Sequence, residues 1–292
     1  MSKQQHIIII GCGAGGATAA QFARKTNRKA SISIYEKGPY PEYSKCGLPY
    51  AISKDIPQFE DLIEFSEEWF KKARISLHLN TTVTDIDNKK QKITIKNKDD
   101  ETSKESYTSL IIATGAVPAI PPIKNITKNT HSFVDGVFTL RTIDDAKQIN
   151  KYATENKQAT VVGAGLIGLE MADCLHRKKM KVSVVEALPH ILQNTLDADM
   201  SSAISKKISE KITLYPNHFA TEITTEKNKI SEVIIQNKET KNIQNINTNL
   251  LIIAAGTKPI TDIAEKAGCD IGQTKGIKVD NTSSTTQKNI YA

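Results

Sequence analysis

The sequence predicts an α/β protein made of two Rossmann-like dinucleotide-binding domains, each a parallel sheet with helices and a small antiparallel insertion. Three observations predict it. A β-branched run, a G-x-G-x-x-G motif and a helix-forming segment occur twice, at residues 6–20 and 160–172. Each copy continues into a second apolar run that ends in a glutamate, Glu36 or Glu186. Each copy also closes with a short apolar run stopped by glycine. The chain therefore reads as a duplicated fold.

The glycine motifs follow directly on the first apolar run of each copy. Their members are Gly11, Gly13 and Gly16 in the first copy and Gly163, Gly165 and Gly168 in the second. The first glycine allows a tight turn, the second lets the backbone approach a pyrophosphate, and the third lets the helix pack closely on the strand. The helix that follows presents unpaired N–H groups to a diphosphate. Each copy thus predicts a dinucleotide-phosphate site.

The acid and the closing run strengthen this interpretation. Glu36 stands 25 residues past the first glycine of its copy and Glu186 stands 23 past its own. A carboxylate at this place accepts hydrogen bonds from ribose hydroxyls. The closing runs, 110–118 and 251–259, both read as a buried strand, a glycine and a proline three residues later. One such glycine motif alone is a weak signal, but two with all these parts predict two dinucleotide sites.

Between these parts, further segments alternate as strands do. They are Ser76–Val83, Lys92–Lys96, Ile212–Tyr215 and Ile230–Gln236, and residues 276–292 read as one more strand pair. We expect residues 1–145 plus 257–292 to form one discontinuous dinucleotide-binding domain. Residues 146–256 are expected to form the other.

Composition places the chain among globular proteins. With 39% hydrophobic and 24% charged residues, it is neither disordered nor a coiled coil. No apolar run approaches the ~20 residues of a membrane span, and no signal-peptide segment precedes the first strand, so a cytoplasmic protein is expected. The net charge of +7 comes mostly from scattered lysines. That pattern favours a solvated surface over a nucleic-acid interface and suits small anionic ligands.

The four cysteines are Cys12, Cys46, Cys174 and Cys269. None forms a C-x-x-C pair, and the histidines have no ligand spacing, so no metal site is expected. Cys46 follows the first acid-ended strand, where a thiol could act on a bound flavin. It could equally be an ordinary small apolar residue. Lys45 beside it would lower the thiol pKa. The other three are interpreted as structural.

Several motifs, in order along the whole chain, carry a resemblance to a known family. They are Gly11–Ala20, Cys46–Tyr50, Ala113–Gly115, Phe138–Ala146, Gly163–Ala172 and Asn289–Ala292. With them the chain resembles the single-cysteine branch of the FAD-dependent pyridine nucleotide-disulfide oxidoreductases. Within that branch it is most similar to coenzyme A-disulfide reductases and their NADH oxidase and persulfide-reductase relatives.

The resemblance implies that residues 1–145 plus 257–292 are the FAD-binding domain and that residues 146–256 are the NAD(P)H-binding domain. It also implies that Cys46 is the redox-active, catalytic residue. Hydride would pass from NAD(P)H to FAD, and Cys46 would then reduce CoA disulfide or a related disulfide or persulfide. In the oxidase alternative, Cys46 cycles through a sulfenic acid and O2 is reduced. Ala51 stands where two-cysteine members carry a second cysteine, so no internal disulfide is expected. The implied cofactor-binding residues are Gly11, Gly13, Ala14, Gly15, Gly16, Glu36, Lys37, Val83, Ala113, Thr114, Gly115, Arg141, Gly163, Gly165, Leu166, Ile167, Gly168, Glu170, Glu186 and Gly256.

A few positions discriminate within the family. Ala14 stands where peroxidases and many oxidases have a histidine, as in the CoA-disulfide reductases. The implied substrate residues are Thr18, Lys25 and Lys45. Thr18 matches the family's CoA contacts, whereas Lys25 replaces an arginine and Lys45 an asparagine. Phe22 is apolar where a polar contact is usual.

The nicotinamide site has its own discriminating residues. Glu186 favours a free 2′-hydroxyl, and no arginine follows it, so NADH is expected rather than NADPH. Glu170 resembles the family glutamate near the nicotinamide, although a helix-surface charge is the alternative.

The resemblance also implies that relatives continue beyond Ala292. They carry an Ile-Gly-Asp segment that binds the flavin and then a dimerisation domain that completes the partner's active site. If this chain acts alone, flavin affinity should fall and the homodimer should be lost. A truncated, non-catalytic dinucleotide-binding module is therefore the second hypothesis.

Overall fold

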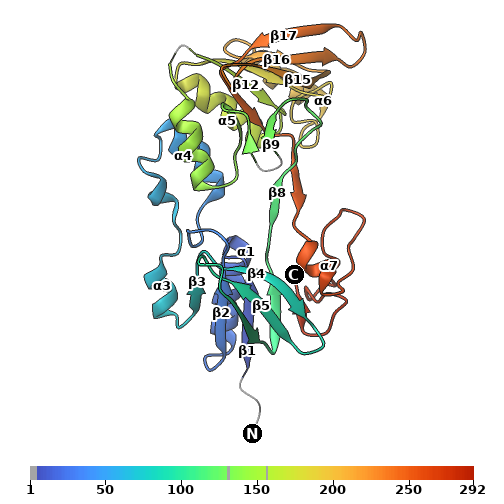
Figure 1. Ribbon diagram of the computed structural model, residues 1–292. Helices are drawn as coiled ribbons and strands as arrows, with labels where there is room; N and C mark the ends of the chain where they lie inside the picture. The colour runs from blue at the N-terminus through green and yellow to red at the C-terminus, as the bar shows by residue number, and fades with distance from the viewer. Residues whose placement is uncertain (1–4, 130–131, 156) are drawn as a thin grey trace. The chain divides into compact units, whose positions relative to one another are not determined.

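The computed structural model describes residues 5–129, 132–155 and 157–292 (Figure 1). It divides into two compact units. The first contains the chain up to Ser44, with Ile63–Val117 and Lys258–Ala292; the second contains Lys45–Leu62 and Pro118–Thr257. The predicted FAD-binding domain also included residues 45–62 and 118–145, which lie in the second unit here. Which cofactor each unit binds stays a prediction.

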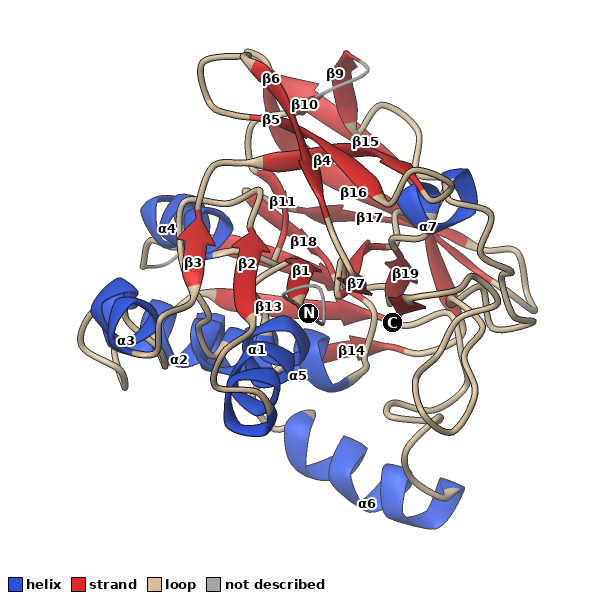
Figure 2. Cartoon of the chain, turned by 90° about the horizontal axis from the view of Figure 1, so that it is seen from below, coloured by secondary structure: helices blue, strands red, loops and turns tan. Residues whose placement is uncertain are grey.

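The first unit is built on a five-stranded parallel sheet with the order β20-β7-β1-β2-β3. Its strands are β1 His6–Ile10, β2 Ser31–Tyr35, β3 Ser76–His78, β7 Ser109–Ile112 and β20 Ile290–Tyr291. The helix α1, Ala14–Thr26, connects β1 to β2 and packs on both (Figure 2). The helix α3, Glu67–Lys72, leads into β3. A three-stranded antiparallel sheet follows, formed by β4 Thr82–Asp87, β5 Lys92–Lys96 and β6 Thr102–Ser106.

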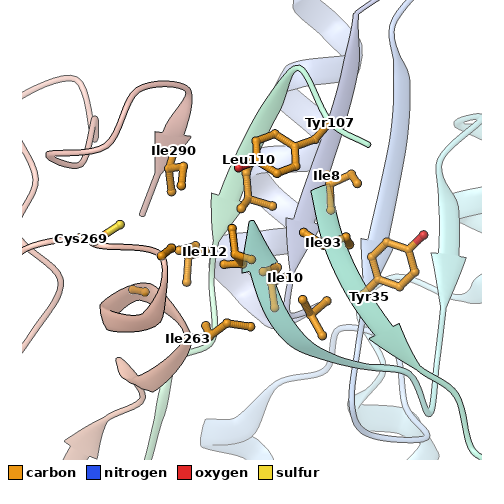
Figure 3. Packing of buried hydrophobic residues seen from close by; sticks show 14 of the residues in the cluster. Ile8, Ile10, Tyr35, Ile93, Tyr107, Leu110, Ile112, Ile263, Cys269 and Ile290 are labelled. Carbon is orange, nitrogen blue, oxygen red and sulfur yellow. The ribbon is translucent and has the colours of Figure 1, made fainter. Parts of the chain in front are cut away.

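The two faces of this sheet bury alternate residues of β1. Ile7 and Ile9 belong to the cluster that includes Ala17 and Ala20 of α1. Ile8 and Ile10 belong to the opposite cluster, together with residues of β4, β5, β7 and the short helix α7, Asp262–Lys266 (Figure 3). A strand covered on both faces explains why the run His6–Ile10 is almost wholly β-branched.

The second unit repeats this plan with the sheet order β11-β18-β12-β13-β14, again all parallel. Its strands are β11 Val137–Thr139, β12 Gln158–Val162, β13 Lys181–Val185, β14 Thr213–Tyr215 and β18 Leu250–Ile253. The helix α5, Leu166–Arg177, connects β12 to β13. The antiparallel sheet is formed by β15 His218–Glu226, β16 Lys229–Asn237 and β17 Ile243–Asn247.

The remaining elements of the second unit lie around this sheet. The helices α4 Ile143–Tyr152 and α6 Ala198–Ile208 belong to it, as does the pair β9 Thr127–Asn129 and β10 Ser132–Phe133. The segment 45–62 contributes η1 Lys45–Gly47, α2 Leu48–Ser53 and η2 Phe59–Leu62. The chain passes between the units through β8 Ala116–Pro118 and β19 Thr257–Pro259, which pair with each other.

The duplication extends to single hydrogen bonds. Gly11 N donates to Tyr35 O at 2.8 Å, and Gly163 N donates to Val185 O at the same distance. A second hydrogen bond is also repeated, just after the strands β7 and β18. Ala113 N donates to Ile10 O, and Ala254 N donates to Val162 O, both at 2.8 Å. The predicted fold class, two Rossmann-like sheets each with a small antiparallel insertion, is confirmed.

The structure differs from the predicted strands in two places. The expected strand Ser76–Val83 is split into β3 and β4, because Asn80 adopts φ +51° in the turn between them. Residues 276–292 form isolated bridges, such as Val279 with Thr285, and the short strand β20, rather than a strand pair. Within the described ranges, no helix combines the length and the apolar character needed to cross a bilayer.

Candidate dinucleotide sites and reactive thiol

Two glycines of the first motif are required by packing. Gly11 has φ +99°, and a Cβ there would lie 2.3 Å from the carbonyl oxygen of Ala113. A Cβ on Gly16 would lie 2.0 Å from the carbonyl oxygen of Gly11. These distances are far below van der Waals contact, so the turn and the close approach of α1 to β1 exclude any side chain.

The second motif repeats this arrangement, and each loop also has an open position, which is Gly15 in the first loop. A Cβ on Gly163, at φ +107°, would lie 2.3 Å from Ala254 O, and one on Gly168 would lie 1.9 Å from Gly163 O. Around Gly165, however, no atom lies within 4 Å of a built Cβ. Packing does not demand a glycine there. The bare backbone instead leaves surface that a phosphate group can approach.

The helices that follow these loops begin without the usual caps. Gly13 and Gly165 occupy the N-cap positions of α1 and α5, and neither first turn contains an acidic residue. The helix α4, by contrast, starts at Thr142 with a complete capping box. The uncapped N–H groups and the positive end of the helix dipole fit a diphosphate in both units.

The two acids make matching contacts to these loops. Glu36 accepts hydrogen bonds from the N–H groups of Cys12 at 2.7 Å and Gly38 at 2.8 Å. Glu186 accepts them from Ala164 at 2.6 Å and Leu188 at 2.8 Å. Each carboxylate is thereby fixed beside its glycine loop. Because a carboxylate has about four acceptor sites, lone pairs remain for ribose hydroxyls.

A cavity of about 1250 Å³ lies in the second unit, at the carboxyl ends of β12, β13 and β18. This is where α/β sheets bind ligands. The cavity brings together seven of the predicted cofactor residues: Arg141, Gly163, Gly165, Leu166, Ile167, Glu186 and Gly256. Glu170 is not among them. It lines a separate cavity of about 240 Å³ between α2 and α5.

Other residues line the large cavity that the sequence analysis did not single out. They include Lys124, Asn194, Thr195, His218 and Phe219. An alignment of the two copies of the fold would have indicated some of these residues. Asn217 N donates to Leu188 O at 3.1 Å, as Asn80 N donates to Gly38 O at 3.0 Å. When the two copies are aligned on these matching hydrogen bonds, Ala220 becomes the counterpart of Val83, a predicted cofactor residue. Phe219 is the residue before Ala220.

The remaining predicted cofactor residues lie in the first unit. Ala14 and Gly15 are exposed at the start of α1, and Lys37 is exposed beside Glu36. Val83 is buried in the core. Ala113, Thr114 and Gly115 follow β7 at the carboxyl edge of the sheet. Thr114 Oγ1 donates to Ile260 O at 2.7 Å, which ties this loop to the segment that follows β19.

Cys46 differs from the other cysteines in its access to solvent. It is exposed in η1, whereas Cys12, Cys174 and Cys269 are 2%, 3% and 5% exposed. Burial raises the pKa of the Cys174 thiol to about 12 and also raises the pKa of Cys269. A reactive thiol must be accessible, so Cys46 is the candidate nucleophile. No group of three or more potential ligand side chains gathers for a metal ion in the described part of the chain.

The predicted substrate residues fall in two places. Thr18 and Lys25 are exposed on one face of α1 with Phe22 between them, at helical spacing. Phe22 is 56% exposed, and the Lys25 Nζ lies 4.8 Å from its ring centroid. Lys45 lies beside Cys46 in the second unit. The structure therefore groups Thr18 and Lys25 in one unit and places Lys45 in the other.

Comparison with known proteins decides the family. Residues 5–292 match the family described as pyridine nucleotide-disulphide oxidoreductase. The chain belongs to this family. Among curated members it is 38% identical over 288 residues to an NADH oxidase of Methanocaldococcus jannaschii. It is 29% identical over 290 residues to a coenzyme A disulfide reductase of Staphylococcus epidermidis. These alignments cover 98% of this chain but 61% and 62% of those proteins.

Solved structures of the family show the same fold. A NAD-dependent persulfide reductase from A. fulgidus superposes with a TM-score of 0.90 at 31% identity. That superposition covers 99% of this chain and 52% of the other. The chain therefore spans about half to three fifths of the length of its relatives, and its whole length belongs to the part that they share.

Proposed function

We propose that this chain is the dinucleotide-binding part of a flavoprotein reductase. The first unit would hold FAD, the second NADH, and Cys46 would reduce a low-molecular-weight disulfide or persulfide such as CoA disulfide. The observation that carries the proposal is the combination of two uncapped, open glycine loops with one exposed thiol among four. The names of the relatives, a coenzyme A disulfide reductase and a persulfide reductase, support this substrate class.

The residues of the two loops fit the two dinucleotides. The N–H groups at the starts of α1 and α5 would hold the diphosphates, and Glu36 and Glu186 would accept hydrogen bonds from the riboses. When bound, the nicotinamide supplies a hydride to the flavin, which then supplies an electron pair for the thiol chemistry. The Glu186 carboxylate would disfavour a 2′-phosphate, so we expect NADH to bind more tightly than NADPH.

The role of Cys46 is nucleophilic. Its thiolate attacks one sulfur of the disulfide, so that a bond forms between Sγ and that sulfur while the original S–S bond breaks. The other half leaves as a thiolate. The mixed disulfide is then cleaved by the two electrons that NADH supplied, which frees the second thiolate and restores Cys46. Ala51, five positions after Cys46, offers no second thiol, so the partner sulfur must come from the substrate.

The exposed face of α1 is the proposed recognition surface for the substrate. Lys25 would pair with phosphate groups of a CoA-like disulfide, and Phe22 offers an exposed ring on which a base can stack.

The four cysteines, all within the described ranges, form no disulfide. This agrees with a reducing compartment, and we propose the cytoplasm.

A second candidate is an NADH oxidase. The 38% identity to the M. jannaschii NADH oxidase favours it, and the same exposed thiol would serve by cycling through a sulfenic acid. Ala14, where many oxidases have a histidine, argues for the reductase instead.

The experiment is an anaerobic NADH titration of the chain reconstituted with FAD. The absorbance band of the flavin should bleach with about one equivalent of NADH. The reduced protein is then mixed separately with CoA disulfide, polysulfide and O2. Fast reoxidation by CoA disulfide or polysulfide supports the reductase, and fast reoxidation by O2 alone supports the oxidase. A chain that stays colourless with added FAD would show a non-catalytic module.

A further inference from the structure

The segment that carries Cys46 is attached to the second unit. The helix α2 packs against α4 and α5, and its side chains Leu48 and Ile52 are 1% and 0% exposed. Lys147 of α4 forms an ion pair with Glu60 at 2.9 Å, near the end of the same segment. Residues 45–62 thus belong to the compact body that contains the large cavity.

Arg177, in the last turn of α5, makes two polar contacts to this segment. Its Nη2 donates to Ser53 Oγ at 3.1 Å and forms an ion pair with Asp55. The adjacent Lys178 donates from Nζ to the Ile52 carbonyl oxygen at 3.4 Å and to Asn150 Oδ1 at 3.0 Å. Arg177 and Lys178 therefore hold the end of α2 from one side.

These contacts lie beside a cavity that opens to solvent between α2 and α5. The cavity of about 240 Å³ lies there, lined by Pro49, Tyr50, Leu169 and Arg177 among others. Incomplete packing leaves the tilt of a six-residue helix less strictly determined. The ion pair is itself more than 40% exposed on both sides, so it adds little to global stability. Its place, between the end of α5 and the end of α2, suits it to set the orientation of α2 instead.

The two ends of α5 touch two different parts of the site. Its first turn follows Gly165 and faces the large cavity, and its last turn holds Ser53 and Asp55. We propose that Arg177 is a positioning residue for Cys46, which fixes the thiol-bearing segment relative to the nicotinamide-binding sheet. This inference rests on the proposed function of Cys46. It concerns where the thiol is held rather than its reaction.

The test uses the full chain and four variants. Arg177→Met keeps the aliphatic part of the side chain and removes the guanidinium. Asp55→Asn removes the negative charge from the other partner of the same ion pair. Arg177→Lys keeps the charge and should rescue. Lys179→Met is the matched control, because Lys179 pairs with Glu155 at 3.2 Å, two residues from Arg177, without touching residues 45–62. If Arg177→Met does not fold, Asp55→Asn decides the test.

The first readout is independent of activity. Bromotrifluoroacetone should label Cys46 alone, since the other thiols are buried, and fluorine NMR then reports the surroundings of the label. We expect one sharp signal in the parent, Arg177→Lys and Lys179→Met, and a second or broadened signal in Arg177→Met and Asp55→Asn. An unchanged single signal in Arg177→Met, or in Asp55→Asn where only that variant folds, would overturn the proposal.

The second readout is kinetic and uses the FAD-loaded protein. Arg177→Met should slow reoxidation by CoA disulfide about tenfold and leave flavin reduction by NADH unchanged, because misplacement affects the thiol step alone. Equal slowing of both steps would indicate a general structural defect and contradict the proposal. If the fluorine signal changes as expected but the parent reduces no disulfide, the positioning role stands and the proposed function fails.

Discussion

The carboxylate of Glu186 accepts a hydrogen bond from the backbone N–H of Ala164 at 2.6 Å. Glu186 follows the strand β13, and Ala164 lies in the glycine loop that follows the neighbouring strand β12. Glu36 and Cys12 repeat this bond in the first unit at 2.7 Å. In each unit the acid thereby fixes the shape of the glycine loop. Its remaining lone pairs are the proposed acceptors for ribose hydroxyls.

This relationship predicts a selective loss of nicotinamide affinity in Glu186→Gln. A hydrogen bond from a hydroxyl to a charged acceptor contributes about 1.5–3 kcal/mol, so the Kd for NADH should rise about 10- to 100-fold. The Kd for NADPH should change less, because the repulsion of its 2′-phosphate is also removed. Isothermal titration calorimetry measures both. Glu36→Gln is the matched control and should leave NADH binding unchanged; an equal loss in the two variants would contradict separate sites.

The glycines of the second motif predict a contrast between stability and binding. Gly168→Ala should lower the free energy of unfolding by about 3 kcal/mol, since its Cβ would lie 1.9 Å from a backbone oxygen. Gly165→Ala should leave urea unfolding nearly unchanged, because its Cβ meets no atom within 4 Å and its φ is −77°. Gly165→Ala should nevertheless weaken NADH binding at least tenfold. Unweakened binding in a stable Gly165→Ala protein would show that the phosphate does not lie there.

Two buried groups predict a loss of stability at alkaline pH. Burial raises the pKa of Cys174 from its ordinary value of 9.0, and that of Tyr107 from 10.0, in both cases to about 12. Between the ordinary and the raised values the folded chain holds these protons and the unfolded chain does not. Their stabilising contribution is thus complete below pH 9 and is lost as the pH rises towards 12, at up to about 1.4 kcal/mol per pH unit for each group.

Urea unfolding between pH 8 and pH 11 measures this loss. Cys174→Ala should be less stable than the parent at pH 8, yet its stability should fall less steeply between pH 9 and pH 10. Parallel curves for the two proteins would show that Cys174 ionises normally in the folded state.

Much of the fold could be predicted because its signals are local. Gly11 and Gly163 have φ near +100°, and a Cβ on Gly16 or Gly168 would lie about 2 Å from a carbonyl oxygen, so each position requires glycine. The β-branched runs beside them are buried on both faces and leave an unbroken apolar pattern. The edge strands β6 and β17 were missed since they are exposed and polar, TSKES and IQNIN, and show no alternation.

The arrangement of the site could be predicted only in part. One contact that joins residues 45–62 to α5 is the ion pair of Arg177 and Asp55, which are 122 residues apart and carry no pattern that pairs them. Glu170 follows the glycine motif in sequence, but the 3.6-residue turn of α5 directs it towards α2. Such contacts arise from tertiary packing rather than from a motif.

The central claim, that electrons from NADH reach a disulfide through Cys46, is tested most directly by rapid mixing of the Cys46→Ser variant loaded with FAD. NADH should bleach the flavin at the rate of the parent protein, and subsequent CoA disulfide should not reoxidise it, whereas the parent and a Cys269→Ser control should be reoxidised. Reduction of CoA disulfide by Cys46→Ser at the parent rate would contradict the account.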